Sequence, residues 1–313
     1  MIAKSAEEPK VSIILLCFNQ RNYLQESIKS VLEQTYSNWE LIISDNGSTD
    51  NSQDVIKEYV NDSRVKLLLY DSNEYLTKRF NQAFLESSGE FISILYGDDF
   101  YLPTKVEDQV NCFSKLSSEW GVVHSPGYNL NEFTKVKSEE KENDVHGDAL
   151  KNILETFFTK GYINPISPLV RKECFEKYLS YEDLFSESEC LYLKYALSYK
   201  FYFLDKPLVV MRQHDKNARW HSKRNTETLD ECLERLKDYE EFPKNCAYPL
   251  LRLRAKNYSN GAWINLRLSE DIDKIWIRRR IYQAFKLDYK QIIKPKNTIS
   301  LILTILPNFI RRG

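Results

Sequence analysis

The residues best suited to chemistry are two adjacent carboxylates, Asp98 and Asp99, which follow an apolar run typical of a buried strand at 90–96. Two carboxylates at the end of a buried strand are costly in free energy unless something positive lies between them. Divalent ions such as magnesium prefer oxygen ligands and commonly bind carboxylates and phosphates together. The pair therefore predicts a divalent metal that is bound to phosphate groups.

A second polar segment, Asp45-Asn46-Gly47-Ser48-Thr49-Asp50, follows the apolar run at 40–44. In open α/β sheets, ligands bind in the crevice beyond the carboxyl ends of the strands. Two strands that deliver polar loops to that edge favour an enzyme that acts on a nucleotide-sugar. The same segment has the composition of a turn in which Asn46-Gly47 leads into a helix cap, and the two interpretations are compatible.

The spacing of apolar residues predicts the elements that position these loops. Continuous β-branched runs indicate strands, and apolar residues three or four apart indicate helices. The expected strands are 11–18, 40–44, 65–70, 91–95, 121–125, 163–170 and a run at 202–211. The expected helices are 24–32, 50–61, 76–87, 103–116, 149–159 and 190–197. This alternation indicates an α/β fold with a doubly wound, mostly parallel sheet and flanking helices. We expect 133–148 to be a charged, flexible excursion.

Length and composition indicate a globular protein. The chain has 313 residues, of which 42% are hydrophobic and 13% aromatic, and its net charge is −1. We expect two domains, a nucleotide-sugar domain at 1–225 and a helical C-terminal extension at 226–313. The near-neutral charge of the whole chain gives no argument for a nucleic-acid partner.

Cysteine usage and the N-terminus predict a cytoplasmic protein. The six cysteines include no Cys-x-x-Cys pair, which argues against a zinc or redox site and favours free thiols in a reducing compartment. The first ten residues are polar and acidic, whereas a signal peptide is basic and then apolar. No apolar run reaches the roughly 18–20 residues that are needed to span a bilayer.

Five segments together resemble the family 2 glycosyltransferases, which have the GT-A fold. They are 11–19, 45–50, Gly89-Glu90-Phe91-Ile92, Gly97-Asp98-Asp99 and Arg212-Gln213-His214. Each is a weak signal by itself, whereas five in the right order at plausible spacing are specific. The resemblance, which runs from about residue 9 to residue 218, implies inverting transfer of a sugar from a nucleoside-diphosphate donor to an acceptor hydroxyl, usually with Mg²⁺ or Mn²⁺.

The resemblance also implies a metal and diphosphate site. It makes Asp98 and Asp99 metal ligands, with Asp98 next to the donor, and it adds His214 as a ligand and Arg212 opposite the phosphate charge. The family motif is often Asp-x-Asp-Asp, and here Tyr96 replaces the first Asp, so fewer protein carboxylates are expected on the metal. The alternative for the two aspartates is a cap on the helix expected from 103.

The nucleoside is implied to lie against the first two strand ends, near Asp45 and Asn46. Asn46 replaces the usual second acid, and since an amide both donates and accepts hydrogen bonds, the base need not be uracil. Phe18-Asn19 stands where the family usually has Tyr-Asn, and the ring can pack on the base or be an ordinary core residue.

Three residues of the third expected helix, Lys78, Arg79 and Asn81, lie where the family often places groups near the diphosphate or ribose. The alternative for the two basic residues is a solvated helix surface.

The catalytic base is implied to belong to a Glu-Asp pair just before a helix. Alignment on Leu191-Tyr192-Leu193-Lys194 puts Glu187 at the Glu and Ser188 at the Asp, and serine cannot act as a base unaided. Glu187 and Glu189 are the candidates, and we favour Glu187 because Glu189 fits a capping box. The pair Glu182-Asp183, about five residues too early, is a fallback.

The last forty residues are strongly basic. From Lys274 to Gly313 the sequence has ten Lys or Arg and one acid, Asp288. The basic residues are interleaved with apolar residues between 275 and 287, and the apolar run 299–306 follows. Basic residues beside a short apolar stretch suit a helix in an anionic membrane interface, at about 1 kcal/mol per basic residue. This fits a glycan or lipid-linked glycan acceptor and peripheral attachment at the inner face of the cell membrane. The alternative is a tail that packs on its own domain or on a partner subunit.

Two functions therefore compete. One is a metal-dependent glycosyltransferase of bacterial-type surface polysaccharide or glycolipid assembly. The other, motivated by Tyr96 and Ser188, is a degenerate domain that binds a nucleotide-sugar or glycan without transferring it. A metal-dependent nucleotidyltransferase is less favoured because no glycine-rich phosphate loop follows the first strand.

Overall fold

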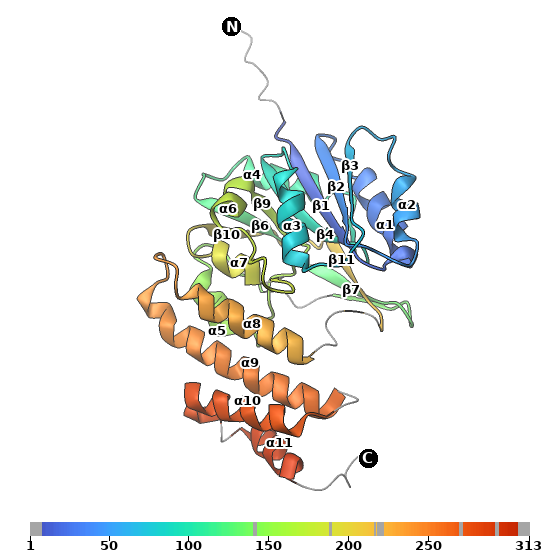
Figure 1. Cartoon of the computed structure of the whole chain (residues 1–313). Helices are drawn as coiled ribbons and strands as arrows, with labels where there is room; N and C mark the ends of the chain where they lie inside the picture. Colours follow the sequence, from blue (N-terminus) through green and yellow to red (C-terminus); the bar gives the residue numbers. More distant parts are fainter. Residues whose placement is uncertain are drawn as a thin grey trace. The chain divides into compact units, whose positions relative to one another are not determined.

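The computed structural model describes residues 8–139, 143–187, 190–215, 217, 222–268, 272–291 and 294–305. It divides into two compact units, the first formed by residues 1–149 and 160–215 and the second by residues 150–159 and 216–313. The first unit contains the strands and the second is helical (Figure 1).

The first unit is built on a seven-stranded sheet of order β10-β6-β9-β4-β1-β2-β3. Only β9 runs antiparallel to its neighbours; the other pairs are parallel. The strands are β1 Val11–Cys17, β2 Trp39–Asp45, β3 Val65–Leu69, β4 Phe91–Tyr96, β6 Trp120–His124, β9 Leu169–Arg171 and β10 Lys200–Phe203. β1 is buried along its whole length, as its unbroken apolar run predicts for a central parallel strand.

Helices lie between these strands along the chain (Figure 1). They are α1 Arg21–Leu32, α2 Ser52–Lys57, α3 Leu76–Leu85, α4 Lys105–Phe113, α6 Lys172–Lys177 and α7 Cys190–Tyr195. The predicted mixed α/β architecture with a mostly parallel sheet is confirmed. The helix expected at 50–61 is shorter than the sequence pattern suggests, since Asp50 bonds the Ser52 backbone and begins the helix two residues later.

A smaller sheet has the order β5-β11-β7-β8. Its strands are β5 Phe100–Tyr101, β7 Gly127–Asn131, β8 Lys137–Glu139 and β11 Val209–Gln213. The run expected at 202–211 is therefore split between two sheets, and Pro207, which has no N–H for a ladder, lies at the break.

Two expectations about irregular segments need correction. The charged excursion expected at 133–148 contains β8, which pairs with β7 as a hairpin because the Asn131 side chain accepts the N–H groups of Phe133 and Thr134 at the turn. The strand expected at 163–170 is reduced to β9, since prolines at 165 and 168 interrupt the ladder before it.

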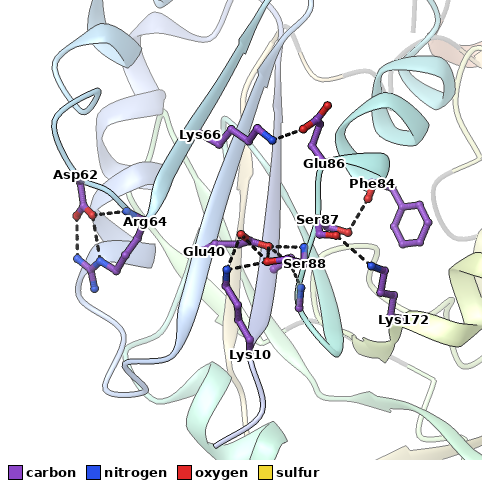
Figure 2. Close-up of polar contacts among 12 residues, drawn as sticks. Lys10, Glu40, Asp62, Arg64, Lys66, Phe84, Glu86, Ser87, Ser88 and Lys172 are labelled. Carbon is purple, nitrogen blue, oxygen red and sulfur yellow. Dashed lines mark hydrogen bonds and ion pairs between the residues drawn. The ribbon is translucent and has the colours of Figure 1, made fainter.

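A polar cluster fixes the sheet at the edge opposite the carboxyl ends of β1 and β2 (Figure 2). The Glu40 carboxylate accepts hydrogen bonds from Lys10 Nζ at 2.8 Å, from Ser12 Oγ at 2.5 Å and from the Ser88 N–H at 2.6 Å. Burial opposes ionisation of this group, but these donors outweigh burial and lower the pKa of Glu40 to about 2. The cluster joins β1, β2 and the α3–β4 connection.

The described part of the second unit is helical, as predicted for the C-terminal extension. It comprises α5 Leu150–Thr156, α8 Ser222–Leu236, α9 Ala247–Leu268, α10 Lys274–Leu287 and α11 Pro295–Ile305, with short 3₁₀ turns at Lys244–Cys246 and Tyr289–Gln291. α9 and α10 share a core of Ala262, Trp276, Ile277 and Ile281. Within the described ranges, no helix is long and apolar enough to cross a membrane.

Candidate functional site

Three central strands end together at one edge of the large sheet. Cys17 pairs with Asp45 and Leu16 pairs with Tyr96, so the loops after β1, β2 and β4 begin side by side. The backbone N–H groups of Asn46 and Gly97 donate to the carbonyls of Cys17 and Leu16 at 2.9 and 3.0 Å. This edge is where the crevice of an open α/β sheet is expected.

Asn19 joins the loops after β1 and β2. Its backbone is left-handed, with φ of 54°, and its side-chain Oδ1 accepts the Thr49 N–H at 2.8 Å. The Asn19 N–H donates to Ser48 Oγ at 2.8 Å. Phe18, beside it, is 39% exposed, so it is not a core residue and its ring lies open at the sheet edge.

Asp45 is completely buried, and its carboxylate is surrounded by donors. It accepts the Ser48 N–H at 2.9 Å and Gln53 Nε2 at 2.8 Å, together with the Ser48 hydroxyl and the Cys17 thiol. These contacts explain how the sequence tolerates a charge at the end of a buried strand. They hold the 45–50 loop in one shape.

Asn46 uses all four of its hydrogen-bonding positions within the protein. Oδ1 accepts Arg79 Nε and the Glu74 N–H, each at 2.9 Å. Nδ2 donates to Asn73 Oδ1 at 2.9 Å and to the Glu74 carbonyl at 2.8 Å. An amide makes at most four such bonds, so in this conformation the Asn46 side chain fixes the 73–74 segment and has no capacity left for a base.

The three candidates on α3 have different surroundings. Arg79 is buried, donates to Asn46 and to the Ser72 carbonyl, and stacks over the Tyr70 ring at 3.5 Å. Asn81 is buried and binds the Ser180 backbone through both ends of its amide. Lys78 is more exposed and lies 3.6 Å from the Glu74 carboxylate.

Asp98 and His214 come together although they are 116 residues apart. His214 Nε2 lies 3.0 Å from Asp98 Oδ2, and both residues are buried. The His214 ring stacks on Tyr23 of α1, with 4.8 Å between the ring centres. His214 directly follows β11, so the small sheet delivers it to the end of β4.

Asp99 and Arg212 hold Asp98 and His214 in position. Asp99 Oδ1 accepts the Arg212 backbone N–H at 2.8 Å, and Arg212 Nε donates to the Asp98 carbonyl at 2.9 Å. The Arg212 guanidinium also binds Glu132 at 2.7 Å and Glu26 at 2.5 Å. Despite the cost of its burial, these carboxylates raise the pKa of Arg212, so it stays charged.

The donors at this edge fit a divalent cation. His214 Nε2 and Asp98 Oδ2 are hydrogen-bonded at 3.0 Å, and two ligands at about 2.1 Å from a metal and at a right angle to one another would stand about as far apart. Carboxylate oxygen and imidazole nitrogen both suit Mn²⁺. No group of three or more such side chains occurs among the residues whose placement is described, so any further ligands would come from phosphate or water.

Glu187 lines a small pocket near the same edge, with Leu16, Thr77, Tyr96 and Ser180 among its walls. Oε2 accepts Lys194 Nζ at 2.9 Å, and both side chains are almost wholly buried. Oε1 is buried and makes no hydrogen bond of standard geometry within the described ranges. Burial raises the pKa of Glu187, and the Lys194 ammonium, with smaller contributions from the Ser180 side chain and the Tyr181 backbone, offsets part of that rise.

The remaining candidates for the base are separate from this pocket or outside the described residues. Glu182 accepts Asn81 Nδ2 at 3.1 Å. Ser188 and Glu189 lie outside the described residues.

Sequence reasoning missed three residues of the site, Tyr23, Glu26 and Glu132. The first two contact His214 and Arg212 from α1, and the third reaches Arg212 from the end of β7. Tyr23 and Glu26 are three residues apart, a spacing that places them on one face of a helix, and this signal was available in the sequence. Glu132 had no comparable signal because its position depends on the hairpin.

The chain is similar in sequence and in fold to known proteins. A family model described as glycosyl transferase family 2 matches residues 12–178. The Escherichia coli UDP-Glc:alpha-D-GlcNAc-diphosphoundecaprenol beta-1,3-glucosyltransferase WfgD is 31% identical over 214 residues, which make up 66% of this chain and 84% of that protein.

Two solved structures show the likeness of the fold. The crystal structure of Staphylococcus aureus TarS 1-349 has a TM-score of 0.70 at 16% identity, over 94% of this chain and 90% of that one. The mannosyltransferase PcManGT from Pyrobaculum calidifontis, in complex with GDP-Man and Mn²⁺, has a TM-score of 0.61 at 14% identity, over 98% and 89% of the two chains.

Proposed function

This chain belongs to glycosyl transferase family 2, and from that premise we propose that it moves a sugar, with inversion, from a nucleoside-diphosphate donor to a hydroxyl of a glycan or lipid-linked glycan. The observation that carries the proposal is the Asp98–His214 pair beside the loops after β1 and β2. A metal ion beside these loops would neutralise the leaving diphosphate of such a donor.

A bound Mg²⁺ or Mn²⁺ would neutralise the diphosphate leaving group, and Asp98 and His214 are the residues that would hold it. Asp99 and Arg212 have a positioning role in this proposal. Every side-chain nitrogen of Arg212 already donates to a protein oxygen, so the arginine fixes the 98–99 turn and the strand that carries His214. The open ring of Phe18 is available to the base, next to Asn19 and Asp45.

Asn46, Arg79 and Asn81 position the backbone segments that border this donor site. Their side chains bind the 72–74 and 180–182 segments, which border the strand ends and the Glu187 pocket. We assign them to holding these segments in place, and we assign Lys78, whose ion pair with Glu74 is partly exposed, to a phosphate of the donor.

Glu187 is the proposed catalytic base among the described residues. Its pKa is raised by burial, which makes the carboxylate a stronger proton acceptor than an exposed one. Its Oε1 has no hydrogen bond of standard geometry from the described chain, and the residue lines a pocket at the same edge as the donor site. An acceptor hydroxyl in that pocket would transfer its proton to Oε1 as it attacks the sugar.

The likeness to WfgD, whose name specifies a diphosphoundecaprenol-linked acceptor, supports a lipid-linked acceptor here. Such an acceptor lies at a membrane. We therefore place the protein at the cytoplasmic side of the membrane, in assembly of a surface polysaccharide or glycolipid.

Release of nucleoside diphosphate tests the proposal. The full chain is incubated with UDP-, GDP- and dTDP-sugars, Mn²⁺ and a set of short glycan acceptors, and both the released nucleotide and the elongated glycan are measured. We expect one donor class to be used and Glu187→Gln to lose at least about 100-fold in turnover while donor affinity stays unchanged. Glu176→Gln, an exposed glutamate on α6, is the matched control.

The buried ion pair of Glu187 with Lys194 favours the second candidate, a domain that binds without transfer. A paired, enclosed carboxylate can be a structural group, in which case Glu187→Gln changes stability and not turnover. Donor binding without product from any donor and acceptor would support this candidate and contradict the first.

A further inference from the structure

The outward side of α10 and of the 3₁₀ turn after it exposes large apolar side chains. Ile275 is 71% exposed, Tyr282 57%, Phe285 38% and Tyr289 68%. Four cations are exposed on the same stretch, namely Arg278, Arg279, Lys286 and Lys290. We call these eight residues the α10 face.

The α10 face is one continuous surface. At 100° per residue, its six members within α10 fall in an arc of about 120°, and Tyr289 and Lys290 follow directly in the turn. The only acid between Lys274 and Gln291 is Asp288, which is buried and binds Gln291 and the Lys290 N–H. The face therefore combines apolar and positive groups without a negative charge.

The opposite side of α10 is firmly packed. Trp276, Ile277, Ile281 and Ala284 are buried, and the Trp276 indole donates to Glu227 of α8 at 2.9 Å. Asp273 caps the first turn by accepting the Trp276 N–H at 2.9 Å. Since this packing fixes the rotation of the helix, the exposed side is a fixed property of the fold.

We propose that the α10 face binds an anionic lipid surface, with Ile275, Tyr282, Phe285 and Tyr289 in the headgroup region and with Arg279, Lys286 and Lys290 on lipid phosphates. The Arg278 guanidinium, which donates to Thr304, adds positive charge to the face. A helix with one apolar, cation-flanked side is the kind of element that lies in a membrane interface. Tyrosine suits that depth because its ring is apolar and its hydroxyl is polar.

A second copy of the chain is a poorer occupant of the same surface. A two-fold interface brings each patch against itself, so the cations would face cations of the partner. Like charges that meet across an interface oppose association. An anionic bilayer offers both the apolar depth and the opposite charge.

This assignment narrows the sequence expectation, which gave the apolar role both to residues between 275 and 287 and to the run 299–306. In the described part of α11, Thr304 accepts hydrogen bonds from Arg278 of α10, and Asn297 bonds Ser259 of α9. α11 is thus anchored to its own unit, while its Ile299 and Ile302 stay 43% and 51% exposed. Leu306 lies outside the described residues.

The inference rests on the proposed lipid-linked acceptor, but vesicle binding tests it independently of catalysis. The full chain is sedimented with vesicles of phosphatidylcholine alone or with 30% phosphatidylglycerol, at low and high salt. The charge variant is Arg279→Glu/Lys286→Glu/Lys290→Glu, and Tyr282→Ser/Phe285→Ser tests the apolar part. Lys115→Glu/Lys151→Glu/Lys244→Glu, which reverses three exposed lysines elsewhere, is the matched control.

We expect the wild type to bind only the anionic vesicles. Each basic residue should contribute about fivefold in affinity, so the charge variant should bind at least about 100-fold more weakly. The apolar variant should lose the part of binding that survives high salt, and the control should bind like wild type. Equal binding by all variants, or none by wild type, would overturn the proposal. So would a wild-type dimer that the α10 variants dissociate.

Donor binding, measured in parallel by thermal shift, separates the two proposals. If the wild type binds donor but not vesicles, the proposal for the α10 face fails alone. If it binds vesicles but no donor, the proposed glycosyl transfer fails alone.

Discussion

Replacement of Glu40 by Gln tests the physical account of the cluster that joins β1, β2 and the α3–β4 connection. The pKa of Glu40 lies at about 2, against an ordinary value of 4.5, because the donors from Lys10, Ser12 and Ser88 outweigh burial. Between these two values the native protein holds fewer protons than the unfolded chain. The carboxylate therefore stabilises the fold fully above pH 4.5, and this contribution is lost as the pH falls through about 2.

The size of the effect follows from the shift. About 2.5 pH units at about 1.4 kcal/mol each give about 3 kcal/mol near neutral pH. By the same linkage, about 2 kcal/mol of this contribution should vanish between pH 5.5 and pH 3. Glu40→Gln keeps the shape of the side chain but turns an amide donor toward Lys10 or the serines.

Urea unfolding, followed by tryptophan fluorescence with the buried Trp39 as a neighbouring reporter, measures this. We expect Glu40→Gln to be less stable than wild type by about 3 kcal/mol at pH 5.5 and by only about 1 kcal/mol at pH 3. Glu86→Gln is the control, since its exposed pair with Lys66 should contribute less than about 1 kcal/mol. A difference between wild type and Glu40→Gln that is the same at both pH values would refute the reasoning.

Two further perturbations probe buried polar groups of the first unit. Burial lowers the pKa of Lys105 well below 10.5. Between the lowered value and 10.5 the unfolded chain holds more protons than the native protein, so stability should rise with pH by about 1.4 kcal/mol per unit. Lys105→Met removes the titrating group and should lose this slope in urea unfolding between about pH 9 and about pH 10, and an unchanged slope would contradict the account. Asn46→Asp removes the two N–H donors that face Asn73 Oδ1 and the Glu74 carbonyl, and should lower the free energy of unfolding by about 2 kcal/mol in thermal unfolding. Asn111→Asp, at an exposed position, should change stability little. Equal stability of the two variants would argue against the saturated amide of Asn46.

The sequence predicts the parts of the structure that follow from periodicity. β1 and β4 are buried apolar runs that end where polar residues begin, so the position of Asp98 at the sheet edge could be predicted. Site residues that come from distant elements could be predicted only with the help of the family resemblance. His214 is an example, because nothing in its local sequence shows that β11 belongs to the small sheet and ends beside Asp98.

Side-chain partners were harder to predict than strands. The saturation of Asn46 depends on the path of the 72–74 segment, which has no periodic signal, and the partners of Arg212 lie 80 and 186 residues away. Glu187 and Lys194 are seven residues apart at the start of a helix, a spacing that also suits two separate surface residues, so their buried pairing appears only in three dimensions.

The central claim is that Asp98 and His214 form the metal site of a nucleotide-sugar donor. Its most direct test is calorimetric titration of donor nucleotides with the full chain, with Mn²⁺ or with EDTA, in wild type, Asp98→Asn, His214→Gln and the exposed control Asp71→Asn. The account predicts that binding requires the metal, weakens at least about tenfold in both site variants and is unchanged in the control. Donor binding that is equally tight in EDTA and in both site variants would contradict it.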